Sequence, residues 1–136
     1  KAPCSVLVVP EDTPATIETV VVAVDLSAPA ADALDVAVAF ADAASLPEVH
    51  AVYAYSVPTS HLKLGKTREE VQPVVAARAA DALREWLAAR DTRGLRVEAH
   101  AVEGDDPAQA VRQQVERLGA DLLVMGTRGR TAASAV

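Results

Sequence analysis

The sequence is short of cysteine and of aromatic residues, and each shortage excludes a class of protein. One cysteine, Cys4, rules out an internal disulfide and a multi-cysteine zinc site. It suits a reducing compartment, and we expect the protein to be cytoplasmic. Four aromatic side chains are too few for the stacking platforms that bind single-stranded nucleic acid.

Basic charge and long apolar runs are also scarce. Lysine and arginine together number 13 against 19 acidic residues, which gives a net charge of −6. A protein that binds nucleic acid usually carries a basic patch, so we expect no such partner. No apolar run approaches the roughly 18 residues of a membrane span, so we expect no membrane partner either.

Hydrophobic residues, in contrast, make up 51% of the 136 residues, which is enough for the core of one domain. Short valine-rich runs alternate with helical patterns. The runs predict buried strands, because β-branched residues favour strands and a proline or an acidic residue ends several of the runs. The expected strands are residues 5–9, 20–24, 49–57, 95–102 and 121–125.

Three helices are expected between the last four strands, and each has a recognisable start. Ser27, Thr67 and Asp106 stand in N-cap positions, and Glu70 completes a capping box with Thr67. Pro73 lies inside the second helical pattern. That helix therefore either begins at the proline or is kinked in its first turn.

This alternation predicts an α/β fold with a mainly parallel, five-stranded sheet and helices on both faces. Polar residues 11–19 are expected to be a linker. In such sheets, ligands bind beyond the carboxyl ends of the strands. Asp25 and Gly126 each follow directly after an expected strand, so both are candidate site residues.

The sequence Gly126-Thr-Arg-Gly129 has two interpretations. Backbone N–H groups that follow a buried strand can bind an anion, and a second glycine keeps side chains away from it. Alternatively, the segment is an ordinary turn. Asp25 is equally open: its carboxylate either accepts a hydrogen bond from a ribose hydroxyl or is a solvated group near a helix start.

Residues 60–67 contain Gly-Lys-Thr between a strand and a helix, as a phosphate loop does. Ser60 stands where that loop requires its first glycine, so we interpret the segment as an exposed linker before a capped helix. No other residue set specifies a reaction. His50, His61 and His100 lack the spacing of metal ligands, and we expect neither a catalytic residue nor a metal held by side chains.

Three segments together resemble the universal stress protein family. Residues 20–27, Val-Val-Val-Ala-Val-Asp-Leu-Ser, are similar to its opening strand. Residues 104–131 are similar to its most recognisable segment, and they include Met-Gly-Thr-Arg-Gly-Arg-Thr. Residues 2–9, Ala-Pro-Cys-Ser-Val-Leu-Val-Val, resemble its closing strand, which in the family comes last.

The order of these segments leaves two explanations. Either the end of one domain precedes most of the next in a tandem protein, or a stretch is absent from the sequence. In both cases residues 1–10 are the closing strand of a preceding or partner domain, and residues 11–19 are a linker. Residues 20–136 are then a universal stress protein domain without its last helix and strand.

The resemblance implies a Rossmann-like three-layer sandwich with an adenine nucleotide pocket, as many members have. By this resemblance Asp25 lies near the ribose, and the backbone at Gly126 and Gly129 takes the phosphates, which Mg²⁺ bridges. The family's next glycine would fall beyond Val136, so half of its triphosphate cradle lies outside this sequence. The implied site residues are Ala23, Val24, Asp25, Ala54, Gly126, Arg128 and Gly129.

Two functions are consistent with this resemblance. The first is a stress-response module that binds ATP and has at most weak ATPase activity. The alternative is a dimerisation or signalling module of the same fold that binds no nucleotide. In either case we expect residues 5–9 to pair with a sheet edge, of this domain or of a second copy, and so to form a homodimer or a tandem contact.

Overall fold

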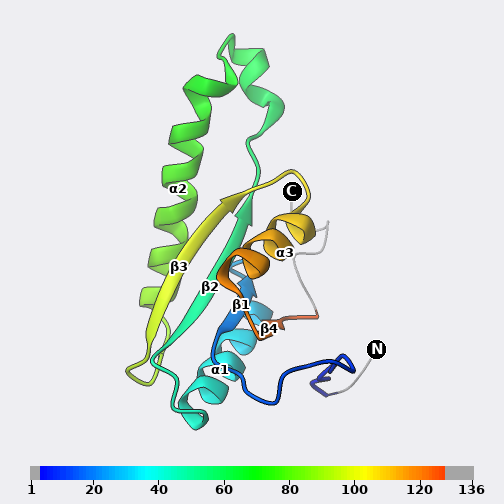
Figure 1. The fold of residues 1–136 in the computed structure, drawn as a ribbon. Coiled ribbons are helices and arrows are strands. Elements are labelled where there is room, and N and C mark those ends of the chain that lie inside the picture. The colour runs from blue at the N-terminus through cyan, green and yellow to red at the C-terminus, as the bar shows by residue number, and fades with distance from the viewer. Residues whose placement is uncertain (1–3, 128–136) are drawn as a thin grey trace.

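The computed structural model describes residues 4–127 (Figure 1). The elements follow in the order β1 (Val20–Val24), α1 (Ala28–Ala43), β2 (Glu48–Tyr55), η1 (Thr59–Leu64), α2 (Arg68–Ala88), β3 (Arg96–Glu103), α3 (Pro107–Leu118) and β4 (Leu122–Met125). The strands form one sheet in the order β3-β2-β1-β4, and every pairing is parallel. The predicted α/β fold with a parallel sheet is therefore confirmed.

The sheet is covered differently on its two faces. In Figure 1, α1 and α2 lie behind the sheet and α3 lies in front of it. Behind the sheet, alternate side chains of β1 pack against Leu34 of α1 and Leu83 of α2, both fully buried. In front, α3 packs on β2 and β3. The core thus sits mainly between the sheet and the first two helices.

The N-terminal segment departs from the sequence prediction. Residues 5–9 form no strand, and no element within residues 4–127 pairs with them, so the sheet there has four strands instead of five. The exposed fractions of Val6 and Val8 are 67% and 81%. The physical reason is that a strand needs a neighbouring strand to bond with, and residues 5–9 do not lie against one. Figure 1 shows this segment extending away from the sheet beyond β4.

The helix starts follow the sequence prediction. Ser27, Thr67 and Asp106 are the N-caps of α1, α2 and α3, and Thr67 and Glu70 form both hydrogen bonds of a capping box. α2 begins at Arg68 and runs through Pro73, so the expectation that it could begin at the proline is wrong. The N-cap fixes the start, and Pro73, in the second turn, removes only the one backbone hydrogen bond that its N–H would have donated.

β4 is less covered than its apolar sequence suggests. Because the sequence does not alternate, we expected both faces of this strand to be covered. Leu123 and Met125, which point to the α3 face, are instead 38% and 60% exposed. The reason is the placement of α3 on β2 and β3, which leaves this end of the sheet open.

Candidate functional site

A large trough lies at the carboxyl ends of β1, β2 and β4. Its volume is about 1100 Å³, and residues of α2 and α3 form its walls. This is slightly above the roughly 300–1,000 Å³ typical of cofactor and ligand sites. Its place matches the rule that open parallel sheets bind ligands beyond the carboxyl ends of their strands.

Asp25 stands on the rim of the trough, where β1 gives way to α1. Its carboxylate accepts hydrogen bonds from the backbone N–H of Ser27, at 3.0 Å, and from the Ser27 hydroxyl. Between them Leu26 has φ 64°, a left-handed conformation that is unfavourable for a leucine. Such strain is concentrated at functional sites. The turn therefore fixes Asp25 firmly beside the trough.

Gly126 lines the same trough at the end of β4. A Cβ atom there would lie 3.1 Å from the carbonyl oxygen of Pro29, in the first turn of α1. The sequence left open whether this glycine serves an anion site or an ordinary turn. The structure adds a further reason, because the close approach of β4 to the start of α1 leaves little room for a side chain.

The structure brings together five of the residues that the sequence implied. Lining the trough are Ala23, Val24, Asp25, Ala54 and Gly126. Parallel pairing explains the arrangement, since Val24 is the register partner of Tyr53 and places the end of β1 beside Ala54. Arg128 and Gly129 lie outside the described residues. The role of all seven in nucleotide binding stays a prediction.

Several polar side chains of the trough were not predicted from the sequence. Arg78 of α2 and Arg112 of α3 bring positive charge to its walls. Arg78 lies between Val75 and Ala79 in the stripe that α2 turns to the trough, and this spacing was an available signal. Asp25 is the only acidic residue among the described lining residues.

Tyr55, at the end of β2, also lines the trough. Burial raises the pKa of its phenol, and the neighbouring charge of Glu103 raises that pKa further, although a hydrogen bond with Gln72 acts the other way. The phenol is therefore protonated at neutral pH. It offers the trough one hydrogen-bond donor and no charge.

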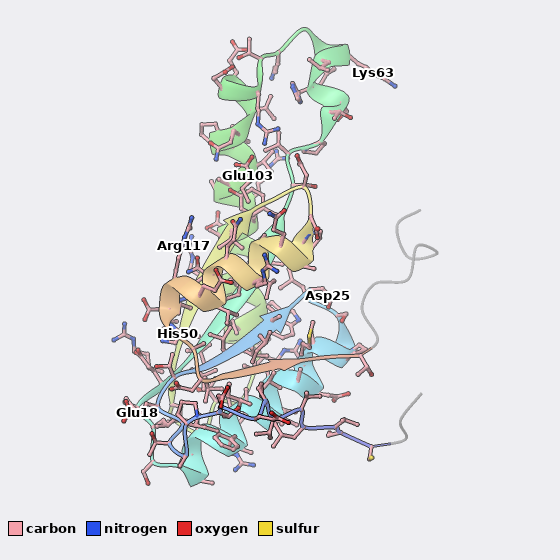
Figure 2. The ribbon with its side chains drawn as sticks, turned by 45° about the vertical axis from the view of Figure 1, so that its right-hand side comes forward. Glu18, Asp25, His50, Lys63, Glu103 and Arg117 are labelled. Atoms are coloured by element: carbon pink, nitrogen blue, oxygen red, sulfur yellow. The ribbon has the colours of Figure 1, made fainter. Side chains whose placement is uncertain are left out.

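The Gly-Lys-Thr segment does not reach the trough. Residues Thr59–Leu64 form the short helix η1, and Gly65 closes it at φ 67° before the capping box of α2. Figure 2 shows Lys63 at the far tip of the molecule, well away from Asp25. The segment therefore connects β2 to α2 away from the trough, but it is not the exposed linker that we predicted, since it forms a helical turn in which His61 is buried.

Two of the three histidines meet on the sheet, which their sequence spacing did not indicate. His50 Nδ1 lies 3.0 Å from His100 Nε2. Burial lowers the pKa of His100, and the neighbouring His50 lowers it further. Spacing along the sequence could not show this contact, because the two rings come from neighbouring strands and not from one helix.

The family follows from a comparison with family models. The model of the universal stress protein family matches residues 16–136. This chain belongs to the universal stress protein family. The match includes the strand that leads to Asp25 and the segment that contains Gly126, so the residues at the trough lie within the family domain.

Solved universal stress proteins have the same fold. The chain is 26% identical to one from Burkholderia pseudomallei. That alignment covers 90% of this chain and 88% of the other, with a TM-score of 0.53. UspA from Lactobacillus plantarum is 21% identical over 90% and 86% of the two chains, with a TM-score of 0.60. A third, solved in complex with cAMP, is 24% identical over 79% and 75%, with a TM-score of 0.57.

Two further findings are negative. A search of curated protein sequences returns no match. Among residues 4–127, no helix combines the length and the apolar character that crossing a bilayer requires.

Proposed function

We propose that this universal stress protein binds an adenine nucleotide, ATP with Mg²⁺, in the trough at the carboxyl ends of its strands. One observation carries the proposal. The five described residues that the family resemblance implies all line a single trough of about 1100 Å³. They come from β1, β2 and the end of β4, segments far apart in the sequence.

The walls of the trough suit each part of the nucleotide. Ala23 and Ala54 offer a flat apolar surface to the adenosine, and Asp25 offers a carboxylate to a ribose hydroxyl. The phosphates then lie at Gly126. The first turn of α1 comes within 3.1 Å of the position of a Cβ atom there, so the positive end of that helix is close by.

Charge also favours a phosphate ligand. Two arginines lie on the trough walls, Arg78 from α2 and Arg112 from α3. Asp25 alone among the described lining residues is a possible carboxylate ligand for Mg²⁺. The ion would therefore be held largely by phosphate oxygens and water, which is how Mg²⁺ usually binds with nucleotides.

The solved relative in complex with cAMP supports the adenine nucleotide class. Calorimetry with ATP and Mg²⁺, with cAMP, and with GTP separates the possibilities. We expect heat with ATP, and equal heat with GTP would reject the preference for adenine. Binding of cAMP alone would keep the nucleotide class and reject ATP. No heat with any of the three at millimolar concentration would reject the proposal.

Gly126→Val is the sharpest variant for this test. A β-branched side chain would collide with Pro29 and block the phosphate approach, so we expect nucleotide binding to be abolished. Gly126→Ala adds only the Cβ atom and should weaken binding less. Thermal unfolding of both variants without nucleotide separates lost binding from lost folding. A folded Gly126→Val protein that binds ATP normally would contradict the phosphate position.

A dimerisation module is the second candidate, and the exposed N-terminal segment favours it. The exposed fractions of its four apolar residues, Val6, Leu7, Val8 and Val9, are 67%, 70%, 81% and 62%. Within residues 4–127, β4 pairs only with β1 and so has an open edge. Residues 5–9 of one copy could add a strand to β4 of another, and a two-fold axis would repeat the contact.

Sedimentation of the full chain and of a chain lacking residues 1–10 tests this second candidate. We expect a dimer to become a monomer or to aggregate. Val6→Lys combined with Val8→Lys should act like the deletion, because charge cannot be buried in that contact. Ala15→Lys combined with Thr16→Lys, at two exposed positions of residues 11–19, is the matched control. Unchanged assembly and stability after deletion would show that the segment is passive.

A further inference from the structure

A cluster of possible metal ligands lies on the α3 face of the sheet, apart from the trough. His50 of β2 is the register partner of Glu98 of β3, and His100 lies two residues further along β3. Residues paired in a parallel sheet point to the same face, so all three side chains meet there. Figure 2 shows His50 and Asp25 at opposite ends of the sheet. Neither histidine nor Glu98 lines the trough.

The donor atoms are spaced almost as a metal ion requires. His50 Nδ1 lies 3.0 Å from His100 Nε2 and 3.9 Å from a Glu98 carboxylate oxygen. One ligand atom from each residue lies within 4.8 Å of the others. Tetrahedral zinc with bonds of about 2.0–2.1 Å holds its ligand atoms roughly 3.3 Å apart. The two observed distances bracket that value, so small side-chain movements would admit the ion.

We propose that His50, His100 and Glu98 form a binding site for a divalent transition metal ion such as Zn²⁺. Two imidazoles and one carboxylate are a common protein ligand set for zinc, with water in the fourth position. The site is separate from the proposed nucleotide site, because none of its three ligands lines the trough.

The residues around the cluster support the ligands as outer partners do in metal sites. His50 Nε2 lies 3.4 Å from a Glu48 carboxylate oxygen, which leaves Nδ1 to face His100 and the metal position. Gln114 of α3 lies 3.4 Å from His100 Nδ1. A carboxylate or amide behind each ring fixes the ring orientation and its tautomer.

Without metal, one proton between the two rings holds them together. The hydrogen-bond order is then Gln114 to His100, His100 to His50, and His50 to Glu48. A metal ion would take the place of the shared proton between the two ring nitrogens. His100 would carry its proton on Nδ1 instead, and the Gln114 amide would turn to offer its oxygen.

Arg96 gives the proposal a test with the opposite sign. Its guanidinium lies 3.3 Å from Glu98 and 3.5 Å from Glu48. It therefore competes with a metal ion for the carboxylate of Glu98. Removing this positive charge should strengthen metal binding, whereas removing a ligand should weaken it. A merely structural cluster would not respond to both changes in this way.

Titration with Zn²⁺ by calorimetry and with Co²⁺ by visible absorption tests the site. The Cys4→Ser chain is the parent, because it removes an exposed thiol that would bind these ions. We expect one ion per chain and the visible bands of tetrahedral Co²⁺. Loss of outer partners typically costs 10–100-fold in metal affinity, so His50→Gln and His100→Gln should each cost more than about a hundredfold.

Three further variants complete the test. His61→Gln is the control, since that ring contacts the carbonyl of Pro58 outside the cluster, and it should leave the affinity unchanged. Glu98→Gln should weaken binding, and Arg96→Gln should strengthen it severalfold. No heat and no visible bands from the folded parent at millimolar metal would overturn the proposal. So would equal losses in His61→Gln and His50→Gln, or weaker binding in Arg96→Gln.

Discussion

α1 and α3 begin with the same chemistry but have different surroundings. Each has a polar N-cap, Ser27 or Asp106, and a proline in its first turn. α1 then buries six side chains, Ala30, Ala33, Leu34, Ala37, Val38 and Ala41, whereas α3 buries Ala110 alone. The face under α1 is a dry core. The face under α3 holds polar and titratable groups and one wall of the trough.

The comparison shows how this fold separates stability from binding. α1 packs on β1 and β4, where apolar contacts are dense. α3 crosses β2 and β3 and leaves its apolar side chains partly exposed to the trough, as for Val111 and Val115. An apolar stripe that stays partly exposed is a surface available to a ligand.

The largest expected effect compares one leucine from each helix. Leu34→Ala in α1 should lower the free energy of unfolding by about 2–5 kcal/mol, because it leaves a cavity in the dense core. Leu118→Ala in α3 should lower it by less than half as much, because that side chain is partly exposed. Urea unfolding measures both. Equal losses would remove the distinction between the two faces.

Asp25→Ala should weaken ATP binding by about 1–3 kcal/mol, the scale of losing a hydrogen bond to a charged group. Asp32→Ala, an exposed carboxylate on α1, is the control and should change nothing. Calorimetry gives the affinities, and thermal unfolding reports folding. If the affinity is unchanged while the melting temperature falls, Asp25 only organises the turn through Ser27, and its ribose role is wrong.

Removing the N-cap of α3 should have a moderate effect. The Asp106 carboxylate accepts hydrogen bonds from the backbone N–H groups of Ala108 and Gln109, at 3.0 and 3.3 Å. Asp106→Ala should lower the free energy of unfolding by about 1 kcal/mol. Asp105→Ala, at the exposed neighbour, should have little effect in the same urea experiment. An equal loss in both variants would show that general charge and not capping stabilises α3.

The smallest effect is expected at Asp121, which holds the approach to β1 beside β4. Its carboxylate accepts hydrogen bonds from the N–H groups of Glu18 and Thr19, both at 2.9 Å, and these bonds lower the pKa of Asp121. A lowered pKa contributes stability above the usual pKa of aspartate, which is lost as the pH falls through the folded-state pKa.

Asp121→Asn therefore has a pH signature that a plain packing change lacks. At neutral pH the asparagine variant should melt slightly below the wild type, because it keeps an acceptor oxygen but loses the charge. In acid, where the wild-type carboxyl is itself protonated, the difference should shrink. Melting curves across that range measure it, and a difference independent of pH would contradict the charge argument.

Sequence alone determined the four strands of the sheet and the starts of the three α-helices. Hydrophobic runs with proline or acidic ends defined β1, and the capping residues Ser27, Thr67 and Asp106 fixed where each helix starts. These are local properties of the chain, because strand propensity and capping depend on neighbours within a few residues. The family resemblance added Asp25, Ala54 and Gly126, which the fold does bring to one trough.

Tertiary structure alone decided what depends on distant parts of the chain. Residues 5–9 have the composition of a strand, yet within residues 4–127 they pair with no strand, because composition does not decide whether a segment is brought against a sheet edge. A side chain at Gly126 would crowd Pro29, which lies almost a hundred residues earlier in the sequence. The meeting of His50 with His100 was equally hidden, because it rests on the register between two strands, and register is set by the whole sheet.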